Sequence, residues 1–116
     1  FSAARIAEAR QAGRPVVVKV TATWCTNCQI LENTVYSQRR LAEAFAARGV
    51  VAVKADVTDR GTPASRWVEQ RFRQQPPLTI VFGPGDGKVI DHVGMFEVDD
   101  LIGWLDHVTA EPAPDG

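Results

Sequence analysis

The sequence has little of several features that define specialised classes of protein. Only two of its 116 residues are cysteines, too few for a scaffold held together by several disulfides. Its 13 basic and 14 acidic residues nearly cancel, which argues against nucleic-acid binding and against electrostatic binding to a membrane. Its apolar runs are only a few residues long, whereas a membrane-spanning helix needs roughly 20 residues. A packed core must therefore stabilise the chain.

The composition is that of an ordinary globular domain, with 45% hydrophobic and 23% charged residues. The length fits one domain, which we expect to span residues 1–109 and to be monomeric. Residues 110–116 contain prolines and acidic residues, and we expect a disordered tail there. The chain begins with Phe1 and shows no cleavable signal peptide. We therefore interpret it as a mature or excised piece, with any targeting or membrane segment lying outside it.

Apolar patterns, capping residues and glycine or proline breaks predict alternating helices and strands. Four strands are expected, at residues 16–21, 50–56, 78–82 and 88–93. Helices are expected at residues 2–11, from Cys25, at 38–48 with Ser37 as N-cap, from Pro63 with Thr62 as N-cap, and at 98–108. The first two strands are rich in valine, as is typical of strands buried on both faces.

The predicted order α-β-α-β-α-β-β-α defines the fold class. Two parallel strands joined by a crossover helix, followed by an antiparallel hairpin, give an α/β fold with one mixed four-stranded sheet. Helices then cover both faces of the sheet, which leaves room for a core sufficient for a stable domain.

The residues that carry chemistry are Cys25 and Cys28, which follow the first strand and open a helix. Functional sites in α/β proteins favour this carboxyl end of the strands. At a helix N-terminus, free backbone N–H groups stabilise the thiolate of Cys25. Cys28 lies three residues later on the same helix face, where it can close a disulfide with Cys25. This arrangement suits disulfide exchange, in which Cys25 attacks a partner disulfide and Cys28 resolves the mixed disulfide.

Two other uses of the cysteine pair are possible on chemical grounds. A zinc site needs about four ligands, and the two histidines, His92 and His107, have no ligand-like spacing to each other. A structural disulfide across two residues closes too short a loop to add much stability. We favour redox chemistry, with no metal and no organic cofactor, because the dithiol is itself the redox group.

From about Pro15 to Val108 the chain resembles the thioredoxin superfamily. The similarity lies in Trp24-Cys25-x-x-Cys28, in Pro77 just before the third strand, and in Val93-Gly94 ahead of the last helix. The resemblance implies the thioredoxin-like fold and a thiol–disulfide oxidoreductase.

Within the superfamily, the chain resembles the C-terminal periplasmic domain of DsbD-type transmembrane reductases and of the related ScsB proteins. The matching residues are the stretch from Thr21 to Gln29, then Glu32, and later Asp56-Val57-Thr58. The resemblance implies a bacterial periplasmic domain of an inner-membrane protein, which takes electrons from a membrane-embedded domain and reduces disulfides of partner proteins. The alternatives are a free-standing thioredoxin-like reductase or oxidase, and a non-catalytic module that uses the same fold only to bind a partner.

Two residues beside the cysteine pair are candidates for positioning a substrate. Pro77 matches the cis-proline of the superfamily, which holds a backbone segment beside the reactive cysteine so that a substrate strand can pair with it. The alternative is that Pro76-Pro77 merely ends the preceding helix. Trp24 directly precedes Cys25, so we expect it at the rim of the active site.

At one position the sequence departs from the family. Lys19 stands six residues before Cys25, where thioredoxins and DsbD-type domains usually carry a buried aspartate that handles the proton of the second cysteine. Lys54 matches a lysine that commonly pairs with this aspartate, and Glu32 matches a carboxylate near the cysteines of DsbD-type domains. One hypothesis is that Lys19 and Glu32 form an exchanged pair under the active site, with Lys54 nearby. The alternative is that the Lys19 ammonium extends from the sheet edge into water.

Overall fold

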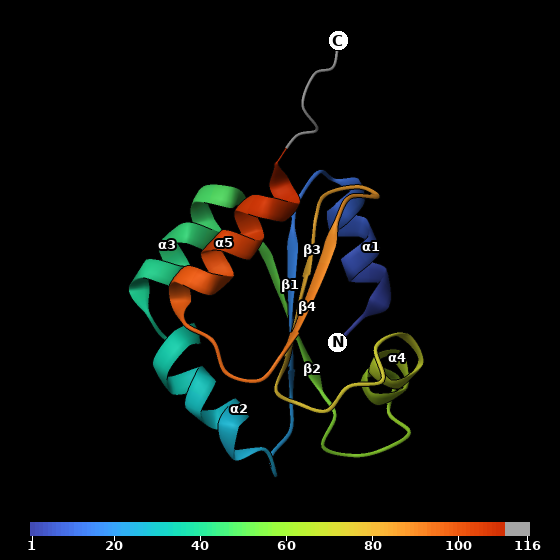
Figure 1. The fold of residues 1–116 in the computed structure, drawn as a ribbon. Coiled ribbons are helices and arrows are strands. Elements are labelled where there is room, and N and C mark those ends of the chain that lie inside the picture. Colours follow the sequence, from blue (N-terminus) through green and yellow to red (C-terminus); the bar gives the residue numbers. More distant parts are fainter. Residues whose placement is uncertain (111–116) are drawn as a thin grey trace.

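A mixed four-stranded sheet forms the centre of the structure, a computed structural model that describes residues 1–110 (Figure 1). The strands lie in the order β2-β1-β3-β4. Their bounds are β1 (Val16–Thr21), β2 (Val51–Asp56), β3 (Leu78–Phe82) and β4 (Val89–Val93). β1 pairs in parallel with β2 and antiparallel with β3, and β3 pairs antiparallel with β4. The predicted α/β fold with a mixed sheet is confirmed.

Helices cover both faces of this sheet (Figure 1). On one face lie α1 (Ala3–Gln11) and α4 (Pro63–Arg71). On the other lie α2 (Thr26–Leu31) with the π-helix η1 (Glu32–Tyr36) that continues it, α3 (Arg39–Arg48) and α5 (Val98–Thr109). No helix within residues 1–110 is both long and apolar enough to cross a membrane. The predicted tail lies, apart from Ala110, outside the described residues.

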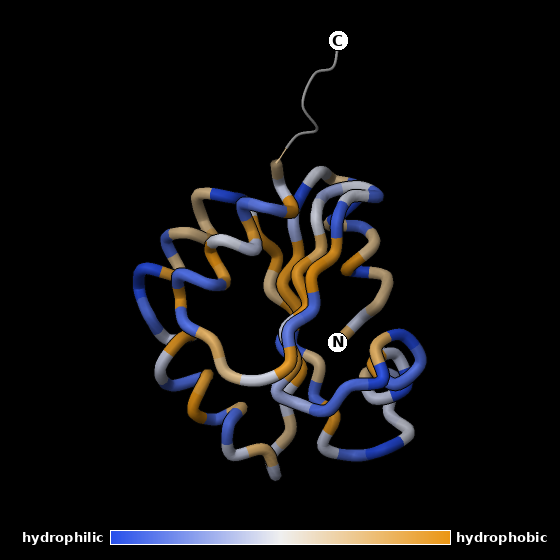
Figure 2. Tube along the Cα trace, in the orientation of Figure 1, coloured by the Kyte–Doolittle hydropathy of each residue, from blue (hydrophilic) through white to orange (hydrophobic). Residues whose placement is uncertain are grey.

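The central strand β1 is packed from both faces. Val16, Val18 and Val20 belong to the core shared with α1 and α4, while Val17 belongs to the core shared with α3 and α5. The apolar strands at the middle of the molecule stand out in Figure 2. Lys19 is the one charged residue of β1, and its side chain is only 23% exposed. The sheet must therefore accommodate a positive charge in one of its two inner strands.

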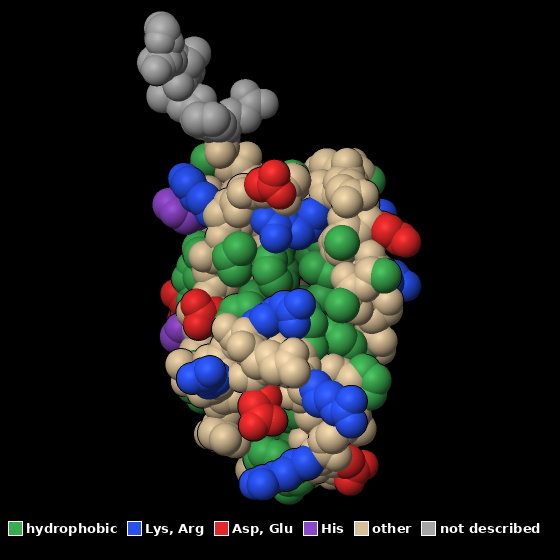
Figure 3. Space-filling view, turned by 90° about the vertical axis from the view of Figure 1, so that its right-hand side faces the viewer, with side chains coloured by type: hydrophobic (Ala, Val, Ile, Leu, Met, Phe, Trp, Pro, Cys, Tyr) green, Lys and Arg blue, Asp and Glu red, His purple; other side chains and the backbone are tan. Residues whose placement is uncertain are grey.

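The face that carries α1 and α4 leaves some apolar surface open. Viewed from this side, hydrophobic side chains are visible among lysine and arginine side chains (Figure 3). Val89 and Val93 of β4 are 44% and 48% exposed, and they lie opposite Phe82 and Leu78 in the register of β3. The outer strand β4 is thus covered less completely than the other strands.

One predicted helix boundary is wrong. Ser37 does not cap the helix that follows it, because α3 begins only after Gln38. The Ser37 hydroxyl instead donates to the Asn33 carbonyl oxygen at 2.7 Å. The physical reason is that the helix opened by the cysteine pair runs on through η1, so that Ser37 lies at the C-terminal end of that helix.

Candidate active site

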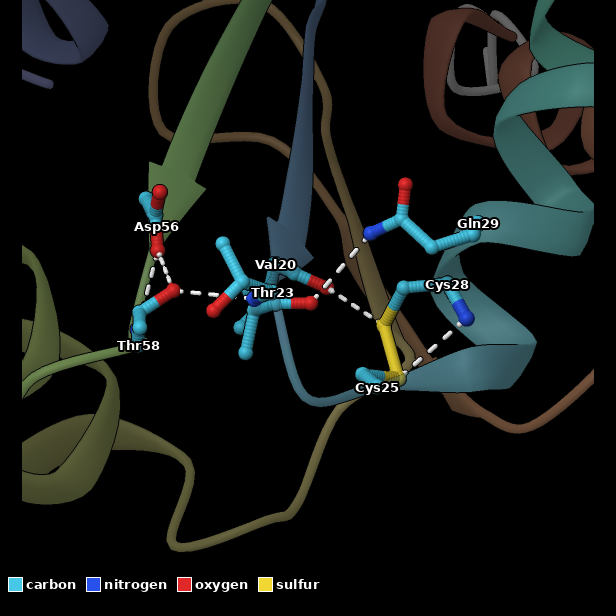
Figure 4. The surroundings of a disulfide bond; sticks show 8 residues. Val20, Thr23, Cys25, Cys28, Gln29, Asp56 and Thr58 are labelled. Atoms are coloured by element: carbon cyan, nitrogen blue, oxygen red, sulfur yellow. Dashed lines mark hydrogen bonds between the residues drawn. A yellow bond between two sulfur atoms is a disulfide. The ribbon is translucent and has the colours of Figure 1, made fainter.

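The two cysteines form a disulfide at the carboxyl end of β1 (Figure 4). Their Cα atoms are 5.3 Å apart, within the range of ordinary disulfides. Cys25 is the N-cap residue of α2, and Cys28 lies in the first turn of that helix. The predicted position of the pair, between a strand end and a helix start, is confirmed.

The surroundings of the two sulfur atoms differ. Cys25 Sγ accepts a hydrogen bond from the Cys28 backbone N–H at 3.2 Å, and a helix N-terminus favours negative charge at this place. Cys28 Sγ lies 3.9 Å from the Val20 carbonyl oxygen, to which a reduced thiol can donate. Both residues are buried, with 6% and 4% exposure, so exposure does not distinguish them. The hydrogen bonds favour the thiolate at Cys25 and the neutral thiol at Cys28.

A small cavity lies beside Cys28, with a volume of about 10 Å³, which is close to the space that one water molecule needs. Residues of β1, α2, η1 and β3 form its wall. The lining includes Lys19, Cys28, Glu32, Tyr36, Pro77 and Thr79. Four of the residues proposed from sequence for this site therefore border one enclosed space.

The Lys19 ammonium is held by Glu32. Lys19 Nζ lies 2.8 Å from Glu32 Oε1 and 3.1 Å from Oε2, and 4.8 Å from the centre of the Tyr36 ring. The ammonium cannot extend from a sheet edge because β1 is an inner strand. Lys54 is the neighbour of Lys19 in the β1–β2 register, but it is exposed. The structure thus brings Lys19 and Glu32 together and places Lys54 outside the cavity.

Pro77 and Trp24 both lie close to the disulfide. The Pro76–Pro77 peptide bond is cis, as predicted, and Pro77 borders the cavity together with Cys28. The Pro77 carbonyl oxygen accepts the Gly94 N–H at 2.9 Å. Trp24 is 57% exposed, which agrees with a place at the rim of the site. The roles of both residues toward a substrate remain predictions.

Tyr36 and Thr79 belong to the cavity and were not expected from the sequence. Their hydroxyl oxygens are 3.0 Å apart and share a hydrogen bond. The sequence spacing could have identified Tyr36. Cys28, Glu32 and Tyr36 are spaced by four residues, and residues with this spacing share one face of a helix. Thr79 carried no such signal, since it reaches the cavity from a strand far along the chain.

Residues 1–110 contain no group of three or more His, Cys, Asp or Glu side chains arranged to hold a metal ion. His92 packs instead against Trp104, with 4.8 Å between the ring centroids, and its Nε2 atom lies 3.0 Å from the Met95 carbonyl oxygen. The chemistry that this site offers is disulfide exchange at the cysteine pair.

The sequence is similar to a known protein family and to thiol:disulfide interchange proteins. Residues 1–84 match the model of a protein family described as Thioredoxin-like. The chain is 32% identical over 97 residues to the thiol:disulfide interchange protein DsbD 1 of Pseudomonas aeruginosa, covering 83% of this chain and 16% of that protein. It is 26% identical over 89 residues to DsbD of Campylobacter jejuni, covering 77% of this chain and 15% of that protein. The chain therefore spans only a small part of these relatives.

Solved structures with the same fold include two of different types. The oxidised C-terminal domain of DsbD from Neisseria meningitidis has a TM-score of 0.69 and 22% identity, with 92% of this chain and 96% of that chain covered. A thioredoxin from Thermus thermophilus has a TM-score of 0.70 and 22% identity, with 93% and 84% covered. At this level of identity the likeness establishes the shared fold.

Tyr36 is expected to ionise only in strongly alkaline solution. Burial raises its pKa to about 12, the hydrogen bond with Thr79 opposes this rise, and the charge of Glu32 adds to it. Tyr36 is the only tyrosine in the chain, so the ultraviolet absorbance of phenolate reports on it alone. We expect a midpoint about two pH units above the usual value of about 10 while circular dichroism remains native.

The same shift has a consequence for stability. The unfolded chain releases the phenolic proton near pH 10 and the folded chain near pH 12. The stability contributed by this group is therefore complete below pH 10 and is lost as the pH rises through 12. Tyr36→Phe should lack both the absorbance change and this loss of stability. A midpoint near 10 in the folded protein would contradict the buried position of Tyr36.

Proposed function

The chain belongs to the thioredoxin-like family, and on this basis we propose that it reduces disulfides of partner proteins by exchange through Cys25 and Cys28. The observation that carries the proposal is the Cys25–Cys28 disulfide at the start of α2, with the Cys28 N–H on Cys25 Sγ. A disulfide across two residues adds little stability, whereas a sulfur held by a backbone N–H suits a nucleophile.

The reaction has two exchange steps. The Cys25 thiolate attacks one sulfur of the partner disulfide, which forms a mixed disulfide and releases the first partner sulfur as a thiolate. Cys28 then loses its proton and attacks Cys25 Sγ, which releases the second partner sulfur and closes the Cys25–Cys28 disulfide. Two electrons pass to the partner, and a reduced dithiol donor must restore Cys25 and Cys28 before the next cycle.

Pro77 and Trp24 are proposed to position the partner. Pro77 borders the same cavity as Cys28. As a proline it has no backbone N–H to offer, and its carbonyl oxygen already accepts the Gly94 N–H, so a partner strand would bond the residues around it. Trp24 offers a largely exposed ring directly beside Cys25. An exposed aromatic ring beside a reactive group is suited to contact a partner protein.

We also propose a cellular context. In this proposal the domain lies in the bacterial periplasm, and its electrons come from a membrane-embedded domain of a longer inner-membrane protein. The support is the similarity to DsbD proteins, of which this chain spans only a small part. The partners are proteins with disulfides, and the dithiol carries both electrons without an organic cofactor.

Glu32 is proposed to accept the Cys28 proton, with Lys19 as the residue that positions its carboxylate. Glu32 and Cys28 border the same water-sized cavity, so a proton can pass between them through one water molecule. The ammonium of Lys19 bonds both carboxylate oxygens and so holds the carboxylate at the wall of this cavity. This pair would perform the task of the aspartate that the family usually carries at the position of Lys19.

Disulfide exchange through Cys25 is tested by trapping its mixed-disulfide intermediate. In Cys28→Ala the second exchange step is impossible, so reduced protein mixed with a periplasmic extract should accumulate mixed disulfides through Cys25. Non-reducing electrophoresis followed by mass spectrometry identifies the adducts. Cys25→Ala is the matched control and should trap far less. A non-catalytic binding module would give no difference between the two variants.

The direction of electron flow is tested by the reduction potential of the cysteine pair. Equilibration in graded thiol buffers, followed by alkylation, should give a value near or below about −220 mV, which is typical of electron donors. A value near about −120 mV would contradict the reductase proposal, because such a potential belongs to proteins that oxidise their partners.

The proton-transfer role is tested in the second exchange step alone. A mixed disulfide between Cys25 and a small aromatic thiol is prepared, and release of that thiol is followed from pH 5 to pH 10. Glu32→Gln should slow release about tenfold at pH 7. This factor is smaller than the roughly hundredfold or greater effect typical of a general base, because the Lys19–Glu32 pair is partly exposed. The difference should vanish above about pH 9, where a free thiol ionises unaided.

Lys19→Met should also slow release at pH 7, because Glu32 loses the ammonium that holds its carboxylate beside the cavity. Lys54→Met is the matched control, since it removes a positive charge at the neighbouring register position outside the cavity. We expect wild-type rates for that variant. Release by Glu32→Gln at the wild-type rate across the whole pH range would disprove the role.

A further inference from the structure

The loop between β1 and α2 is attached to the end of β2 through Thr58. The Thr23 backbone N–H donates to Thr58 Oγ1 at 2.9 Å (Figure 4). The Trp24 indole N–H donates to the Thr58 carbonyl oxygen at 3.2 Å. Thr23 and Trp24 are the two residues immediately before Cys25. A single threonine from a neighbouring strand end therefore holds both of them.

Asp56 determines how the Thr58 hydroxyl is oriented. Asp56 Oδ1 accepts from the Thr58 backbone N–H at 2.9 Å and from the Thr58 hydroxyl at 2.5 Å (Figure 4). A hydroxyl has one proton to donate, and the Thr58 hydroxyl donates it to Asp56. Its oxygen is therefore left to accept the hydrogen bond from the Thr23 backbone N–H. Both hydrogen bonds from Thr58 lower the pKa of Asp56, which keeps the carboxylate ionised at neutral pH.

Other polar groups at this loop are held as well. The Val57 N–H donates to the Thr21 carbonyl oxygen at 2.8 Å. The Ala22 carbonyl oxygen accepts from the Cys25 N–H at 3.1 Å and from Gln29 Nε2 at 3.3 Å. The loop is thus tied to β2 on one side and to α2 on the other. The tie to β2 at Thr23 is the one that depends on a side-chain hydroxyl.

We propose that Thr58, oriented by Asp56, is a positioning residue for disulfide exchange, which holds the Thr23–Trp24 segment so that Cys25 stays at the start of α2. This inference rests on the proposed function, because it concerns the rate at which Cys25 attacks. Neither Thr58 nor Asp56 contacts a sulfur atom, so both act through the loop. If the loop is free to move, Cys25 Sγ spends less time on the Cys28 N–H and its thiolate is less favoured.

The test compares reduced variants in their reaction with a small aromatic disulfide, 5,5′-dithiobis(2-nitrobenzoate), and with the disulfides of insulin. Thr58→Val keeps the size of the side chain but loses the hydroxyl, and should react about five-fold more slowly with both, a factor that matches the loss of one hydrogen bond. Thr58→Ser keeps the hydroxyl and should react within twofold of wild type.

Three further variants separate positioning from general stability. Thr109→Val removes a hydroxyl that donates to the Leu105 carbonyl oxygen at 2.8 Å in α5, and it should keep the wild-type rate. Asp56→Ala should resemble Thr58→Val. The double variant should be no slower than Thr58→Val alone, because Asp56 acts through the same hydroxyl. Urea unfolding of the oxidised proteins confirms that each variant is folded at the assay temperature.

Wild-type rates in Thr58→Val, or equal slowing in Thr58→Val and Thr58→Ser, would overturn the inference. Additive effects of Asp56→Ala and Thr58→Val would also overturn it, since they would place the two residues in separate roles. A failure of the proposed function gives a different result, in which even the reduced wild-type protein reacts with neither disulfide faster than free cysteine does.

Discussion

The enclosed position of β1 determines where the functional residues lie. This strand is hydrogen-bonded along both edges and packed on both faces, so its end has little freedom to move. Because β2 is parallel to β1 and β3 is antiparallel to it, the ends of β1 and β2 and the start of β3 meet at one edge of the sheet. Cys25, Thr58 and Pro77, which lie far apart in the sequence, each follow or precede one of these strand ends.

Because β1 is enclosed, the charge of Lys19 is largely removed from water. A charge in an inner strand is costly unless a partner of opposite sign is close, and Glu32 supplies that partner from the helix above the strand. The pair is neutral as a whole, yet it keeps a carboxylate at the wall of the cavity beside Cys28. An inner strand can thus hold a lysine when a carboxylate on the facing helix pairs with it.

Local patterns in the sequence were sufficient to predict the sheet and the cysteine pair. The valine-rich runs predict both parallel strands, but the expectation that both are buried on two faces is wrong for β2, which is an outer strand with every second residue exposed. A Cys-x-x-Cys at a strand-to-helix junction indicates thiol–disulfide chemistry. The π-helix η1 was not predicted, because an extra residue in one helical turn has no marker in composition, and for that reason Ser37 was given the wrong role. The pairing of Tyr36 with Thr79 was also missed, since it joins residues 43 apart. The cis bond at Pro77 was expected only through the family resemblance, since most bonds before proline are trans.

The two outer strands leave the sheet with open edges. On β2 every second residue is exposed, and Lys54 and Asp56 are among them. On β4 the exposed Val89 and Val93 flank the exposed Asp91. Charged side chains on an outer strand oppose the addition of a strand from another molecule. As a charged residue on an outer strand, Lys54 is suited to a task that does not involve the cysteines, namely to oppose pairing of β2 with a strand of another molecule.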